Sequence, residues 1–206
     1  MSLDATVPID GNGITGGVRV NELPSNIRDL KTDINNGLIY TGDSRIWNHV
    51  RIAAPSWKIG ATGPTADYVG VVPVLKFDTA TDDSVHYSII VTYRIETGSE
   101  VEVVVDWCYT GGADAGTVCW GLEYINLEAG NAVAGGTTTT TETSPGSHTS
   151  GQMVRTIFSP GIVGAAAHDV IGIRLFRDVS EDNLATDAQL IQVHFEFLCN
   201  KLGKLI

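Results

Sequence analysis

From residue 71 onward the chain repeats one pattern, in which apolar and polar residues alternate over short segments that turn residues separate. In the last of these segments every second residue is apolar, namely Ile191, Val193, Phe195 and Phe197. A period of two is typical of a half-buried antiparallel strand and cannot form one face of a helix. The C-terminal part of the chain is therefore predicted to be built from strands.

Similar alternation predicts further strands upstream, and Pro73 marks the first of them as an edge strand or a bulged strand. The other segments lie at 85–95, 100–107, 118–124, 153–158 and 170–176. Their spacers are polar or rich in glycine, as in antiparallel sandwiches. We predict an all-β fold, an antiparallel jelly-roll-like β-sandwich over residues 71–200. The strand phase places four aromatic residues in its core: Trp107, Trp120, Phe195 and Phe197.

Residues 1–60 have a different character and are predicted to form an extended N-terminal arm with one short helix at about 25–36. Apolar residues recur there at spacings of three, four and four: Ile27, Leu30, Ile34 and Leu38. A helix of about three turns is marginal in water, so this stripe needs another surface to pack against. Only 50–53 is expected to be a strand in the remainder, where Trp47 and Trp57 are predicted to anchor a subunit boundary. The arm is thus assigned to attachment and oligomerisation.

Charge is distributed unevenly along the 206 residues, whose formal net charge is −11. Residues 1–60 carry six basic and six acidic residues, whereas 61–206 carry seven basic and eighteen acidic ones. An acidic body repels phosphate backbones, so nucleic acid is not a predicted partner. The sequence has no run of apolar residues long enough to span a bilayer, so no membrane span is predicted.

No motif of catalysis is found in the sequence. The nucleophile elbow G-x-S-x-G is absent, as are the phosphate-binding and dinucleotide-binding fingerprints. Glu102 and Asp106 point outward from one predicted strand, with Glu123 as a neighbour, and could be read as a glycosidase-like acid pair. Outward carboxylates on a solvated strand more often serve solubility and edge protection. We predict that the chain is not an enzyme and has no catalytic residue.

The acidic loops at 78–83 and 178–182 can be read in two ways. They could bind Ca²⁺ weakly, or their carboxylates could accept hydrogen bonds within turns, which is the favoured interpretation. Cys108, Cys119 and Cys199 lack the paired spacing of a zinc site, and are predicted to be thiols packed as small apolar groups. No metal and no cofactor is predicted.

Four pieces of the sequence carry a resemblance to a known family: LKFDTATDDS at 75–84, VEVVVDWCYTGG at 101–112, TVCWGLEY at 117–124, and IRLFRDVSEDNLATDAQLIQVHFEF at 173–197. Their fixed points are Phe77-Asp78, Trp107, Trp120-Gly121, Arg177-Asp178 and Asp187-Ala188. The block from Val74 to Phe197 resembles a β-sandwich family of virion and tail-fibre proteins of tailed bacteriophages. That family has no catalytic residues to transfer to this chain.

The resemblance implies a bacteriophage virion structural protein, assembled in the host cytoplasm. The expected form is a short fibre of the tail or head, attached through the N-terminal arm to capsid, portal/neck or tail proteins. A homotrimer is expected because an isolated amphipathic helix and two tryptophans bury best around a symmetry axis. Two alternatives stay open: a capsid decoration (cement) protein, and a head that binds a host surface glycan. The glycan hypothesis requires exposed aromatics in the 109–116 or 128–150 loops, where Tyr109 is available.

Overall fold

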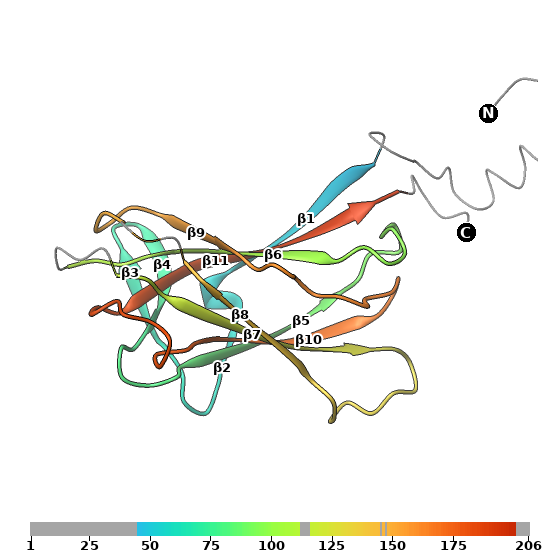
Figure 1. The fold of residues 1–206 in the computed structure, drawn as a ribbon, viewed down its shortest axis with the longest axis horizontal. Coiled ribbons are helices and arrows are strands. Elements are labelled where there is room, and N and C mark those ends of the chain that lie inside the picture. Colours follow the sequence, from blue (N-terminus) through green and yellow to red (C-terminus); the bar gives the residue numbers. More distant parts are fainter. Residues whose placement is uncertain (1–44, 112–115, 145, 147, 201–206) are drawn as a thin grey trace, which may run out of the picture.

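The computed structural model describes residues 45–111, 116–144, 146 and 148–200, which fold into two antiparallel β-sheets packed face to face (Figure 1). The all-β sandwich predicted from the alternation is therefore confirmed. The predicted helix at 25–36, with its apolar stripe, lies outside the described residues. In the part of the chain that the structure covers, no helix is long and apolar enough to cross a membrane.

The first sheet has the order β3-β4-β11-β6-β9, with β1 paired to β11. The strand β11 is the longest of these, and β4 and β1 pair with successive parts of it while β6 runs along its other side. The bounds are β1 (Ile46–Ala53), β3 (Thr65–Val69), β4 (Val72–Phe77), β6 (Val101–Cys108), β9 (Val154–Ile157) and β11 (Ala188–Cys199).

The second sheet has the order β2-β5-β10-β7-β8. Its central strand β10 pairs with β5 on one side and with β7 on the other. The bounds are β2 (Lys58–Ile59), β5 (Ser84–Ile90), β7 (Cys119–Leu127), β8 (Thr138–Thr143) and β10 (Val170–Arg177). The edge strand β8 is the threonine-rich run of the sequence, and it pairs with β7 alone among the described strands.

The two sheets meet in a core of apolar side chains that follows the predicted strand phase. The four predicted core residues Trp107, Trp120, Phe195 and Phe197 are fully buried. Trp107 of β6 and Trp120 of β7 join the sheets with ring centroids 6.3 Å apart in an edge-to-face arrangement. Phe77 packs edge-on against Trp120 at 5.1 Å. Such aromatic pairs add to the free energy already gained from the apolar area they bury.

The sandwich begins at Ile46 and not at residue 71, because β1, β2 and β3 all pair into the two sheets. The strand predicted at 50–53 is only the second half of β1, whose first four residues are exposed on both faces. A short 3-10 helix η3 (Ala54–Ser56), with Pro55 near its start, then carries the chain across to β2. Residues 45–60 therefore belong to the sandwich, and the predicted arm boundary at 60 was too late.

Trp57, predicted as an anchor between subunits, is a core residue of its own chain. It is 5% exposed, and its ring lies 5.4 Å from the ring of Tyr87 and 6.4 Å from that of Phe195. Pro55 and the glycines that follow disguised this position, because they interrupt the alternation that would have marked a strand.

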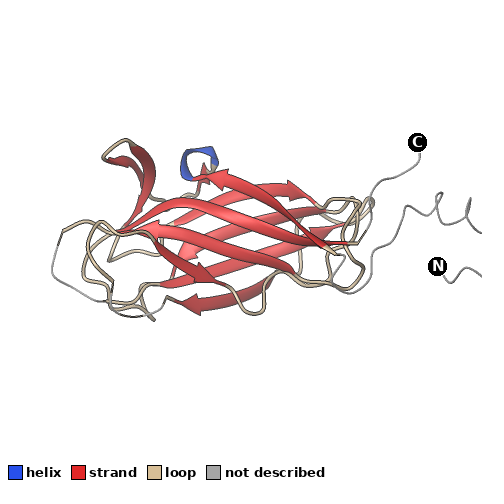
Figure 2. Cartoon of the chain, turned by 90° about the horizontal axis from the view of Figure 1, so that it is seen from above, coloured by secondary structure: helices blue, strands red, loops and turns tan. Residues whose placement is uncertain are grey.

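The two ends of the sandwich differ. At one end the first residues of β1 and the last residues of β11 project together as a ribbon (Figures 1 and 2). The β3–β4 hairpin lies toward the other end (Figure 1). Its two-residue turn begins with Gly70 at φ 62°, as a tight hairpin turn with glycine in first position requires.

Candidate functional site

A fully buried arginine lies where the end of β10 meets the end of β4. Arg177 Nε and Nη2 donate to the two carboxylate oxygens of Asp182, at 2.5 and 3.1 Å. The remaining guanidinium hydrogens reach backbone carbonyls of four residues, namely Phe77, Asp78, Leu184 and Thr186. Because every donor group has a partner, the positive charge is stabilised inside the protein.

This arginine explains why three of the sequence fixed points lie where they do. Phe77-Asp78, Arg177-Asp178 and the loop that ends at Asp187-Ala188 all converge on one guanidinium. The loop 178–187 is thereby tied to the start of the loop that follows β4. These residues are therefore held in place by hydrogen bonds of the sandwich itself.

The acidic loops use their carboxylates as hydrogen-bond acceptors within and between turns. Asp78 accepts from the Ala80 amide at 2.6 Å, and Asp83 accepts from the Asp78 amide at 2.8 Å. Asp82 accepts from the Val179 amide at 3.1 Å, which links the two loops. In the described ranges, no group of three or more His, Cys, Asp or Glu residues could hold a metal ion. The turn interpretation thus accounts for these residues.

A second polar cluster lies on the outer face of β6, β9 and β11 around Asp106. The sequence placed Asp106 outward on a solvated strand, and the structure corrects this, because its side chain is fully buried. Arg155 donates to both carboxylate oxygens, from Nε at 2.8 Å and from Nη2 at 3.2 Å. Gln192 adds a third hydrogen bond at 3.0 Å. The neighbouring strands supply these partners, because Asp106 stands opposite Arg155 on one side and Gln192 on the other.

His194 completes the cluster, with its Nε2 atom 2.8 Å from an Asp106 oxygen but without hydrogen-bond geometry. Burial lowers the pKa of His194 and outweighs the attraction of Asp106, while the charges of Arg51 and Arg155 act in the same direction as burial. Burial alone would raise the pKa of Asp106, but the hydrogen bonds from Arg155 and Gln192 hold that pKa below its usual range. The cluster therefore pairs an ionised aspartate with a neutral imidazole.

The structure does not bring together Glu102, Asp106 and Glu123, the carboxylates that were considered as a glycosidase-like acid pair and its neighbour. Glu102 stands opposite Glu196 in the register, and burial together with that neighbouring charge raises its pKa. Asp106 is held by Arg155, as described above. Glu123 lies on the other sheet, where Thr137 and Arg174 bind its two carboxylate oxygens and hold its pKa below the usual range. An acid and a base on opposite sheets cannot flank one glycosidic bond.

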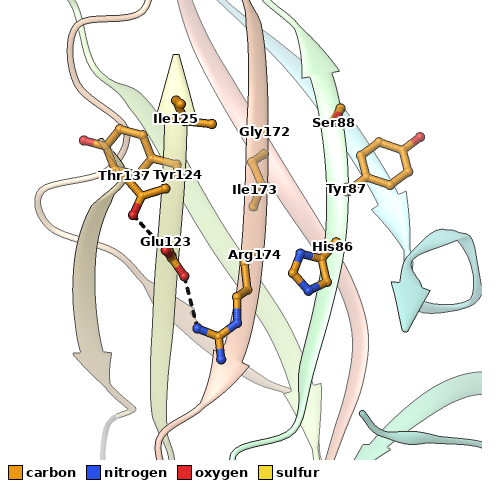
Figure 3. Close-up of a pocket in the computed structure, with 10 residues that line it drawn as sticks. All are labelled: His86, Tyr87, Ser88, Glu123, Tyr124, Ile125, Thr137, Gly172, Ile173 and Arg174. Carbon is orange, nitrogen blue, oxygen red and sulfur yellow. Dashed lines mark hydrogen bonds and ion pairs between the residues drawn. The ribbon is translucent and has the colours of Figure 1, made fainter. Parts of the chain in front are cut away.

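A hollow of about 320 Å³ opens on the outer face of the second sheet, between β5, β10 and β7 (Figure 3). Its floor is Gly172, where an added Cβ would lie 3.1 Å from a side-chain carbon of Ile125. Arg174 and Glu123, joined at 3.1 Å, form one wall with Thr137, and His86 stands on the other side (Figure 3). The hollow thus offers donors and acceptors around a small open space.

The three cysteines are buried and unpaired. Cys108 stands beside Trp107 on the outer side of the first sheet, and Cys119 beside Trp120 on the outer side of the second. By strand alternation the two thiols therefore lie on the outer faces of opposite sheets. Burial raises the pKa of all three thiols, so each behaves as the predicted small apolar group.

The predicted site residues are separated by the fold. Trp47 is half-exposed near the start of β1, whereas Trp57 is in the core. Tyr109, the aromatic that the glycan hypothesis needed, is 1% exposed and donates to the His148 carbonyl at 2.7 Å. Sequence reasoning missed the burial of Arg177 and His194, since one is a charged residue at the end of a strand and the other reads as an outward polar residue.

No protein-family model matches this chain, and no curated protein is similar to it at a significant level.

Proposed function

We propose that this chain is a bacteriophage virion structural protein, a short trimeric fibre of the tail or head that is attached through its N-terminal arm. The observation that carries this proposal is the polarity of the sandwich. Ile46, the first residue of β1, pairs with Cys199, the last residue of β11, so the described chain begins and ends at the end where the β1–β11 ribbon projects (Figure 1). The other end carries the β3–β4 hairpin. Such a molecule has one end suited to anchoring and one suited to display.

We further propose that the sandwich is a jelly roll, and its strand order supports this. From β4 onward the chain forms β4-β11-β6-β9 in one sheet and β5-β10-β7-β8 in the other. Successive strands cross between sheets, except from β7 to β8. Two four-stranded sheets interleaved in this way form the jelly roll, which is common in viral capsid proteins and lectins. Fold alone does not assign function, so it adds only weight to the proposal.

The distribution of charge agrees with a particle surface protein. The acidic excess lies in 61–206, whereas 1–60 carries equal numbers of acidic and basic residues. Many copies of an acidic body stay soluble and separate when they are crowded on a particle, while a neutral segment can contact other chains.

Purified particles test this proposal directly. Mass spectrometry of particles from the host culture should detect the chain at a stoichiometry that is a multiple of three per attachment point. A chain that lacks residues 1–44 should be missing from particles although its sandwich folds. Absence of the full chain from purified particles would overturn the proposal. Immunogold labelling separates the decoration alternative, because gold spread over the capsid surface indicates cement and gold at a vertex or the tail indicates a fibre.

A second candidate function, a head that binds a host surface glycan, is favoured by the hollow at Gly172. Carboxylate, guanidinium and hydroxyl groups around a small open site are suited to sugar hydroxyls. A glycan array with the full chain should give hits that the Arg174→Ala variant loses, while Tyr68→Ala on the distant β3–β4 hairpin keeps them. An array without hits removes this candidate and leaves the fibre proposal intact.

A further inference from the structure

The four tryptophans of the chain differ sharply in exposure. Trp57, Trp107 and Trp120 are 5%, 0% and 0% exposed, whereas Trp47 is 49% exposed. Trp47 lies in the projecting part of β1, and its neighbour Ile46, which is 46% exposed, points to the opposite face of the strand. A half-exposed tryptophan is costly in water, because the indole is large and mostly apolar. The face of β1 that carries Trp47, over residues 45–49, is therefore an apolar surface that the described chain leaves partly uncovered. This surface is called the root of β1 below.

The charged groups around Trp47 are satisfied within the chain. Arg45 binds Glu96 at 2.8 Å, and His49 lies 2.9 Å from Glu196. The residue opposite Trp47 in the register is Leu198, which is partly buried. The apolar pair is thus bordered by ion pairs, which is the arrangement of an interface with an apolar centre and a polar rim.

The backbone at the same place is also available. In the described part of the chain, β1 pairs with β11 alone, so the other edge of β1 has no strand partner. Natural edge strands are usually protected by charges or proline. β1 contains no acidic residue, and its one arginine, Arg51, lies in the second half of the strand. The strand itself therefore adds no negative charge that would repel another acidic body.

We propose that the root of β1, centred on Trp47 and Leu198, is the contact surface between copies of this chain. The occupant is a second copy because the described chain begins here, at Arg45, and the 44 residues that precede it in the sequence are the segment that the proposed function assigns to oligomerisation. Any assembly that gathers the N-terminal segments of several copies brings their β1 roots together. This inference rests on the proposed trimeric fibre and names its interface. The closing of a symmetric ring then covers each Trp47 by a neighbouring copy.

Acrylamide quenching of tryptophan fluorescence tests the proposal on the unmodified full chain. Because the other three tryptophans are buried, quenching at any concentration reports Trp47. The inference predicts strong quenching of the dilute monomer and its loss as sedimentation shows the trimer forming. The Trp47→Ala variant should need at least about thirtyfold more protein to assemble, since an interface tryptophan is a typical hot spot.

Tyr68→Ala is the matched control, because Tyr68 is a 72% exposed aromatic on the β3–β4 hairpin toward the opposite end. Its assembly should equal that of the wild type. If a trimer forms while Trp47 stays open to quencher, the inference is wrong and the fibre proposal stands. A chain that stays monomeric at high concentration overturns the proposed trimer itself. The quenching result decides the matter even if Trp47→Ala fails to fold.

Discussion

The buried ion pair between Arg177 and Asp182 allows a sharp prediction about stability. The side chain of Arg177 is fully buried and that of Asp182 is 4% exposed. The Asp182→Asn change keeps the size of the side chain but removes the charge that neutralises the guanidinium. Leaving one partner of a buried pair uncompensated costs about 3–5 kcal/mol, and hydrogen bonds to charged groups contribute about 1.5–3 kcal/mol each. We expect the free energy of unfolding to fall by about 3–5 kcal/mol.

The same loop supplies a matched control for this change. Asp187 pairs with Lys76 at 3.0 Å, but their side chains are 29% and 38% exposed. The chemically identical change Asp187→Asn should therefore cost at most about 1 kcal/mol, as exposed pairs do. Because both variants make the same substitution in the same loop, the difference between their losses of unfolding free energy measures the effect of burial.

Equilibrium unfolding in urea, followed by the fluorescence of the buried tryptophans, measures both variants. The Asp182→Asn transition should shift to lower urea with an unchanged slope, and its Tm should fall by roughly 6–20 °C, at about 2–4 °C per kcal/mol for a domain of this size. If the two variants lose the same free energy, the guanidinium is not held as described and the reasoning fails. Insoluble Asp182→Asn beside well-behaved Asp187→Asn would count as a large loss.

Three further predictions concern other parts of the sandwich. Burial lowers the pKa of His194, so the unfolded chain binds more protons than the folded one below about pH 6.5. Unfolding free energy should therefore decrease from pH 7 to pH 5, and His194→Gln should reduce that decrease in urea titrations at each pH. A Cβ at Gly121 would come within 2.1 Å of the Phe176 ring, so Gly121→Ala should cost about 1–3 kcal/mol. Gly136→Ala, with open space around it, should stay within about 0.5 kcal/mol, and equal losses would contradict this packing. A thiol reagent should label the native chain slowly and all three cysteines rapidly in denaturant, because burial raises their pKa; rapid native labelling would refute their burial.

The sequence by itself determined most of the strands after residue 71 and the part of the core that they form. Alternation with a period of two is local information, because each residue of a pleated strand points to the opposite side from its neighbours. It was enough to place Trp107 and Trp120 between the sheets.

Only the tertiary structure decided what happens on the outer faces and at the strand ends. The period of two says which face Asp106 is on, but not that side chains from β9 and β11 hold it there. The partners of Arg177 include carbonyls about a hundred residues earlier in the chain, which no local pattern reveals. Trp57 reads as part of an irregular arm until the pairing of β1 with β11 brings it to Phe195. Burial and charge pairing depend on contacts between distant segments, and those exist only once the sheets have formed.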